Sequence, residues 1–67
     1  MRVKITDQYT GHDGVYEVAT LAESQTNLST TPAEAQAWIE AQAALQAEDW
    51  SKVADLSALL KFDIEVV

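Results

Sequence analysis

The chain lacks cysteine and has a single histidine, His12, among its 67 residues. Disulfide bonds within the chain are therefore excluded, and so is a Cys/His zinc centre, which needs four such ligands. His12 lies in a glycine-rich turn, and the chain has no Gly-x-Ser-x-Gly, P-loop or Gly-x-Gly-x-x-Gly motif. Because no nucleophile has a base in a suitable sequence context, we expect a protein that is not an enzyme and uses no metal or cofactor.

Positive charge is also scarce. Four Lys and Arg face eleven Asp and Glu, which gives a formal net charge of -7 and a sequence pI near 4.2. An anionic protein repels the phosphates of nucleic acids and of anionic membranes. We therefore expect no direct binding to nucleic acid or membrane, and a protein partner with a basic surface.

Long hydrophobic runs are missing as well. No apolar stretch is long enough for a membrane span, and Met1–Thr6 is too polar for the apolar region of a signal peptide. These features predict a cytoplasmic protein.

The short length limits stability. We expect one domain, residues 1–67, that buries only about 60% of the surface of its unfolded chain. Small domains without disulfides or metals often gain stability by association. A homodimer or a stable complex with another protein is therefore expected.

Two segments, residues 2–6 and 62–66, alternate apolar and polar residues with the period of a strand. A third segment, residues 15–20, is rich in β-forming residues and follows the turn signal Asp13-Gly14. The segments 2–6 and 15–20, which flank this turn, predict a hairpin. Residues 21–30 remain open between a loop, an irregular edge strand and a short helix at 21–25.

Two helices are predicted from their start signals. Thr31-Pro32-Ala33-Glu34 combines a capping box with a proline at the first helical position and starts a helix near 32–47. Asp49 can cap a second helix, near 50–60, whose apolar side includes Leu59. The junction is short, so the two helices form an αα-hairpin.

The sequence predicts an α+β fold of order ββααβ, with a three-stranded sheet (order 2-1-3) and the αα-hairpin packed on one face. An αα-hairpin goes out and back, so we expect the last strand to run parallel to the first. Arg2 and Lys4 can then lie opposite Asp63 and Glu65, which favours this strand order. The predicted core is Val3, Ile5, Val18, Trp38, Ile39, Leu45, Val53, Leu56, Leu60, Phe62 and Ile64, with Tyr16 on the face of Val18.

The first predicted helix has no cation to balance its acids. Between Pro32 and Ser51 the chain has no Lys or Arg. An aromatic residue follows at the start of the second helix, and tryptophan is enriched at binding hot spots. The candidate partner-binding residues are Glu34, Glu40, Glu48, Asp49 and Trp50.

These features predict a non-enzymatic protein–protein interaction module. In size and charge the chain resembles small acidic proteins of phages and mobile elements. Some of those inhibit host enzymes by presenting carboxylates where phosphates would bind. That resemblance implies an inhibitor that occupies a basic nucleic-acid-binding surface of a host protein. The alternative is a small oligomeric structural or virion-assembly component that uses its apolar edge strands.

Overall fold

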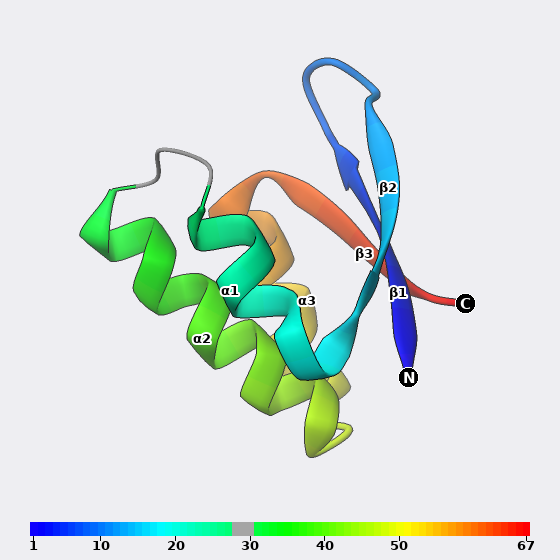
Figure 1. Ribbon diagram of the computed structural model, residues 1–67, viewed down its shortest axis with the longest axis vertical. Coiled ribbons are helices and arrows are strands. Elements are labelled where there is room, and N and C mark those ends of the chain that lie inside the picture. The colour runs from blue at the N-terminus through cyan, green and yellow to red at the C-terminus, as the bar shows by residue number, and fades with distance from the viewer. Residues whose placement is uncertain (28–30) are drawn as a thin grey trace.

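The computed structural model describes residues 1–27 and 31–67 (Figure 1). Its strands are β1 (Arg2–Asp7), β2 (Asp13–Glu17) and β3 (Phe62–Val66). Its helices are α1 (Leu21–Thr26), α2 (Pro32–Gln46) and α3 (Trp50–Leu60), and a 3-10 turn, η1 (Val18–Thr20), connects β2 to α1. The sheet has the order β2-β1-β3, and the helices lie on one side of it. The predicted α+β fold, strand order and helix pair are confirmed.

The segment left open by the sequence begins as a helix. Leu21 and Gln25, four residues apart in α1, are both buried, which is the spacing of one helical face. α1 therefore adds a short helix ahead of the predicted pair and packs beside α2. Asn27 is the C-cap of α1, and residues 28–30 lie outside the described residues.

The direction of β3 differs from the expectation. β1 pairs antiparallel with both of its neighbours, so the prediction of a parallel last strand is wrong. Two helices would return the chain to the end of the sheet where β1 starts. α1 makes a third pass, so the chain enters β3 from the opposite end (Figure 1). Lys4 still lies opposite Glu65, as the charge pattern predicts.

The second strand ends earlier than predicted. β2 stops at Glu17, whereas the composition predicts a strand to residue 20. The Val18 N–H still donates to the carbonyl of Met1 at 3.0 Å. The chain then continues as η1, in which Val18 is a buried core residue.

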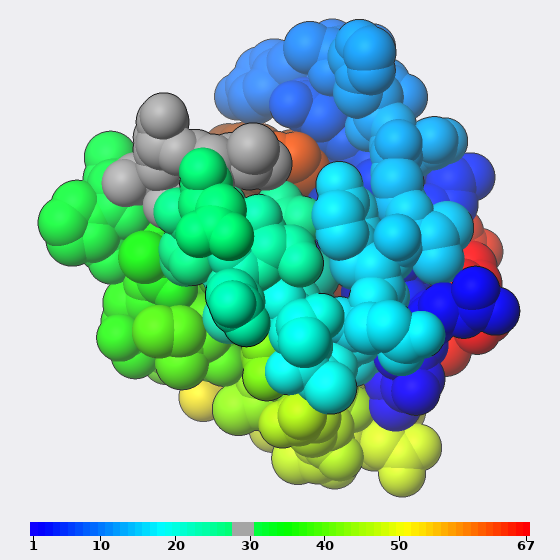
Figure 2. All heavy atoms as spheres, in the orientation of Figure 1, coloured from blue at the N-terminus to red at the C-terminus, as the bar shows by residue number. Residues whose placement is uncertain are grey.

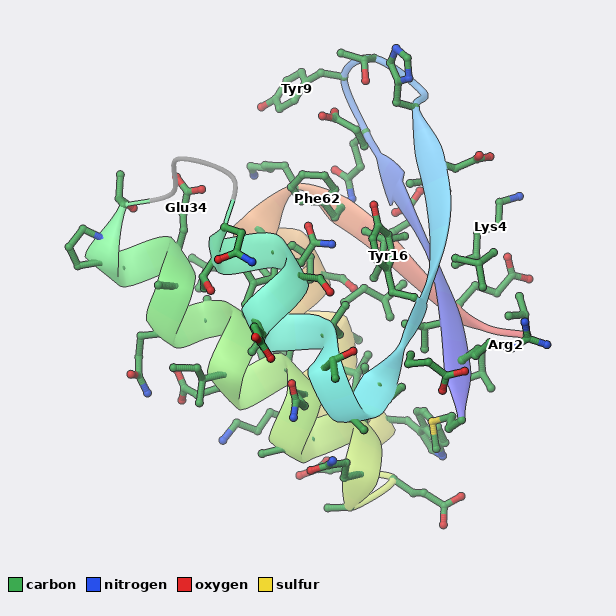
Figure 3. All side chains as sticks on the ribbon, in the orientation of Figure 1. Arg2, Lys4, Tyr9, Tyr16, Glu34 and Phe62 are labelled. Carbon is green, nitrogen blue, oxygen red and sulfur yellow. The ribbon has the colours of Figure 1, made fainter. Side chains whose placement is uncertain are left out.

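The core lies between the sheet and the helices. Val3 and Ile5 of β1 are buried against it, while Tyr16, Phe62 and Ile64 are partly buried. Figure 3 shows Tyr16 and Phe62 on the helix side of the sheet. The Phe62 ring packs against Trp38 with ring centroids 5.5 Å apart, so the central tryptophan is a core residue as predicted.

Two apolar helix positions are exposed against expectation. Ile39, predicted in the core, is 51% exposed, and Leu59, predicted on the apolar side of its helix, is 69% exposed. α2 contacts both α1 and α3, and most of the residues that it buries are alanines. The buried stripe of α2 consists of Ala37, Trp38, Ala41, Ala44 and Leu45. Ile39 follows Trp38 by one residue, a rotation of roughly 100° about the helix axis, and therefore faces solvent.

Candidate functional site

The five predicted partner-binding residues do not form one cluster. Glu34 lies in the first turn of α2, and Glu48 follows the last turn of the same helix. Their separation along the helix axis is roughly 20 Å, at about 1.5 Å per residue. Only Glu48, Asp49 and Trp50 are adjacent, and we call these three residues the α2–α3 junction.

Glu40 has a cation that the local sequence does not reveal. Its Oε1 lies 3.9 Å from the Nζ of Lys52 on α3, and both side chains are partly exposed. The absence of Lys and Arg between Pro32 and Ser51 therefore does not leave this carboxylate unpaired. A surface pair of this kind contributes between about 0 and 1 kcal/mol to stability. Glu40 therefore has a cation beside it, and its charge is partly balanced on the surface.

Glu48 ends α2 in a Schellman motif. The Asp49 N–H donates to the Ala44 carbonyl at 2.9 Å, and the Glu48 N–H donates to the Leu45 carbonyl at 3.2 Å. Glu48 has a φ of 56°, in the left-handed region that usually favours glycine. A non-glycine residue there costs about 1–2 kcal/mol, so the backbone of the junction is strained at Glu48.

Asp49 and Trp50 begin α3. The Asp49 Oδ1 accepts a hydrogen bond from the Lys52 N–H at 3.3 Å, so the predicted N-cap is confirmed. Trp50 is the first residue of the helix, and its side chain is 49% exposed. Trp38, by contrast, is 1% exposed, so the two tryptophans have different roles. Among the described residues, neither Glu48 nor Asp49 forms an ion pair.

Glu34 belongs to another surface. It borders an open hollow of about 120 Å³ between α2 and α3, which is lined also by Ala33, Ala37, Leu59 and Leu60. Binding pockets for small molecules have volumes of about 300–1,000 Å³. The hollow is too small for such a ligand, although the exposed Leu59 makes this surface apolar. The sequence pattern placed Leu59 on the buried side of its helix and therefore missed it.

The β1–β2 turn carries an exposed aromatic residue that sequence reasoning also missed. Asp7 Oδ1 accepts hydrogen bonds from the N–H groups of Tyr9 and Thr10, and Gly11 has a φ of 76°. The turn projects from the body of the molecule (Figure 2), and Tyr9 is strongly exposed on it. The glycines predicted this turn, but the exposure of Tyr9 has no signal in the sequence.

The outer face of the sheet is charged. Arg2 Nε lies 3.9 Å from Glu17 Oε1, and Lys4 Nζ lies 3.6 Å from Asp13 Oδ2. Figure 3 shows Arg2 and Lys4 on the side of the sheet away from the helices. The cations of β1 therefore pair with acids of β2.

The single histidine lies in the β1–β2 turn. His12 is exposed, and its backbone N–H donates to Thr10 Oγ1 at 3.3 Å within the turn. Within residues 1–27 and 31–67, no three His, Asp or Glu side chains lie close enough together to hold a metal ion. In the same ranges, no helix combines the length and apolar character needed to cross a membrane.

Comparison with known proteins gives no further identification. No protein-family model, no curated protein and no solved structure matches the chain. Its function is therefore inferred from its own surfaces.

Proposed function

We propose that this protein is a non-enzymatic protein–protein interaction module that binds its partner through the α2–α3 junction. The observation that carries the proposal is the half-exposed Trp50, which follows two carboxylates that form no ion pair among the described residues. A large aromatic side chain removes much apolar surface from water when a partner covers it. Covering Trp50 would therefore stabilise a complex.

The charge of the chain indicates the chemistry of the partner. With a net charge of -7, the protein attracts basic surfaces over a long range and speeds their encounter. In its sharper form, the proposal is a cytoplasmic inhibitor that occupies a basic nucleic-acid-binding surface of another protein. Glu48 and Asp49 would then take positions that phosphates otherwise fill.

The test begins with capture of partners on the immobilised protein at low and at high salt, and identification of a bound protein. Association and dissociation rates are then measured with the purified partner. Trp50→Ala should mainly raise the dissociation rate, because the indole packs against the partner by apolar, short-range interactions. Ile39→Ala is the matched control, since Ile39 is apolar and equally exposed at 51% but lies on α2.

The charges are tested with the fold preserved. Asp49→Ser removes the carboxylate but keeps an N-cap, because serine caps as well as aspartate. Combined with Glu48→Gln, it should lower the association rate and flatten its dependence on salt. Glu23→Gln with Asp55→Asn removes the same charge from exposed sites elsewhere. Equal binding by the junction variants and their controls would place the partner surface elsewhere.

A further inference from the structure

Within residues 1–27 and 31–67, the outer edge of β3 has backbone groups without a hydrogen-bond partner, and the hydrogen bonds to β1 identify them. The Val67 N–H donates to the Arg2 carbonyl at 3.1 Å, and the Gln8 N–H donates to the Lys61 carbonyl at 3.2 Å. Even-numbered residues of β1 therefore bond to β3, and bonded pairs alternate along an antiparallel ladder. Asp63 and Glu65 direct their N–H and C=O groups to β1. The other three residues of β3, Phe62, Ile64 and Val66, direct theirs to the free edge.

The side chains of β3 are also incompletely covered. Val66 is 47% exposed and Ile64 is partly exposed, although both point to the helix side of the sheet. Their neighbours in the ladder, Val3 and Ile5 of β1, are buried. An additional strand beside β3 would cover the side chains of Ile64 and Val66 on the edge away from β1.

The charged side chains of β3 indicate which residues an added strand should carry. Asp63 and Glu65 are on the outer face, and neither forms an ion pair among the described residues. Asp63 Oδ1 accepts a hydrogen bond from Gln8 Nε2 at 3.0 Å. On the β1 side these two acids lie opposite Thr6 and Lys4. Opposite charges on adjacent strands stabilise pairing, and like charges destabilise it.

We propose that the free edge of β3 binds an extended segment of a partner protein that carries Lys or Arg at alternate positions and apolar residues between them. The strand β1, Arg2-Val3-Lys4-Ile5-Thr6, already has this pattern and pairs with the other edge of β3. The added segment becomes a fourth strand. Its backbone bonds Phe62, Ile64 and Val66, and its cations lie beside Asp63 and Glu65. This surface consists of residues other than the α2–α3 junction.

A second copy of the chain is disfavoured as the occupant. If two β3 strands pair antiparallel with their ends aligned, Asp63 lies opposite Glu65 of the second copy in both directions. A shift of the register by two residues places Asp63 opposite Asp63, or Glu65 opposite Glu65. The first of these shifts also places Glu65 opposite Lys61, which lies just before β3. The aligned register and the second shift set acid only against acid, which costs free energy.

The opposite edge of the sheet is a weaker candidate. There the free backbone groups belong to Asp13, Val15 and Glu17 of β2, because the Val18 N–H bonds to β1. The carboxylates of Asp13 and Glu17 are already paired with Lys4 and Arg2. The amides of β2 therefore serve as an internal control.

The probe is a capped synthetic peptide, Arg-Val-Lys-Ile-Arg-Val-Lys, titrated into the isotopically labelled protein and followed by amide chemical shifts. The expected result is saturable shifts at Phe62, Ile64 and Val66, with smaller shifts at the β2 edge. Two peptides are controls: Glu-Val-Glu-Ile-Glu-Val-Glu, which has the wrong charge, and Arg-Pro-Lys-Pro-Arg-Pro-Lys, which has the same charge but cannot donate along a ladder. Neither control should reproduce the shifts.

Val66→Pro tests the backbone directly, because it removes an N–H that faces the free edge and leaves the ladder to β1 intact. Loss of about one hydrogen bond should weaken binding roughly fivefold relative to Val66→Ala, which keeps the N–H. Asp63→Asn with Glu65→Gln should weaken binding by about two- to fivefold and reduce its salt dependence. The hydrogen bond from Gln8 can persist in that variant.

Three results would overturn the inference. They are equal binding of the proline peptide, shifts centred on the helices instead of β3, and self-association that Val66→Pro abolishes. The titration needs no natural partner, so its failure is separate from that of the proposed function. If a natural partner loses affinity in Trp50→Ala but the peptide causes no shifts at β3, only the inference about β3 is refuted.

Discussion

Removing the side chain of Gln42 should destabilise the protein more than any other substitution of an exposed or half-buried polar residue in α2. Gln42 Nε2 donates to the Ala19 carbonyl at 3.0 Å, and its Oε1 accepts from the Ala22 N–H at 2.9 Å. The helix α1 has no side-chain N-cap from its own residue, Thr20. Gln42 therefore supplies the cap of α1 from a neighbouring helix and joins η1 to α2.

The magnitude follows from the two hydrogen bonds. Each contributes about 0.5–1.5 kcal/mol, and a partly buried group left without a partner costs somewhat more. Gln42→Ala should thus lower the free energy of unfolding by about 1–3 kcal/mol, after a small gain in helix propensity. A single core of this size supplies only about 3–5 kcal/mol. The variant should therefore be close to the limit of folding at room temperature.

The measurement is urea unfolding followed by circular dichroism and tryptophan fluorescence. Gln46→Ala is the matched control, because it makes the same chemical change on an exposed side chain of the same helix. Hydrogen exchange at the Ala22 amide gives a local readout and should accelerate only in Gln42→Ala. If the two variants unfold within about 0.3 kcal/mol of each other, the Gln42 bridge does not stabilise the fold and the expected loss is refuted.

Three further predictions concern stability. Glu48→Gly should raise the free energy of unfolding by about 0.5–1 kcal/mol in urea, because glycine adopts the positive φ without strain; a loss of stability would contradict the junction geometry. Ile5→Ala should lower the free energy of unfolding by about 2–5 kcal/mol, and Ile64→Ala should lower it less because Ile64 is only partly buried. A larger loss for Ile64→Ala in thermal unfolding would show that β3 is covered. Gln25→Met should stabilise by about 1 kcal/mol in calorimetry, because the buried Gln25 Nε2 has no hydrogen-bond partner among the described residues; a destabilised variant would indicate that the amide is satisfied.

The local signals in the sequence were reliable where one residue determines the geometry. Thr31 accepts the Glu34 N–H at 3.2 Å and Pro32 begins α2, as the capping pattern predicts. The Asp49 cap and the alternating pattern of β3 are equally local. Each of these features depends on residues within a few positions of one another, which is the range that a single sequence can report.

The parts that the sequence did not predict depend on distant residues. The orientation of α2 is determined by contact with α1 and α3, and alanine gives no hydrophobic signal strong enough to show it. The direction of β3 depends on whether residues 21–26 add a helical pass. The pairing of Glu40 with Lys52 joins two helices. Of the candidate acids, Glu34 and Glu40 lie on α2, whereas Glu48 and Asp49 lie between α2 and α3, and the separation of Glu34 from this pair follows from the length of α2.

The central position of β1 has a consequence for how the protein is made. β1 is the first strand of the chain, and its two partners are a nearby strand and the last strand, with Val3 paired to Val66. During synthesis β1 can form the hairpin early, but it stays open along its other side until β3 has left the ribosome. The contacts between β1 and β3 join residues that are far apart in the sequence, so most of the chain must be ordered before they form. Contacts of such long range slow folding. The sheet should therefore close in a single late step, after β3 has emerged, that requires β1 and β3 together.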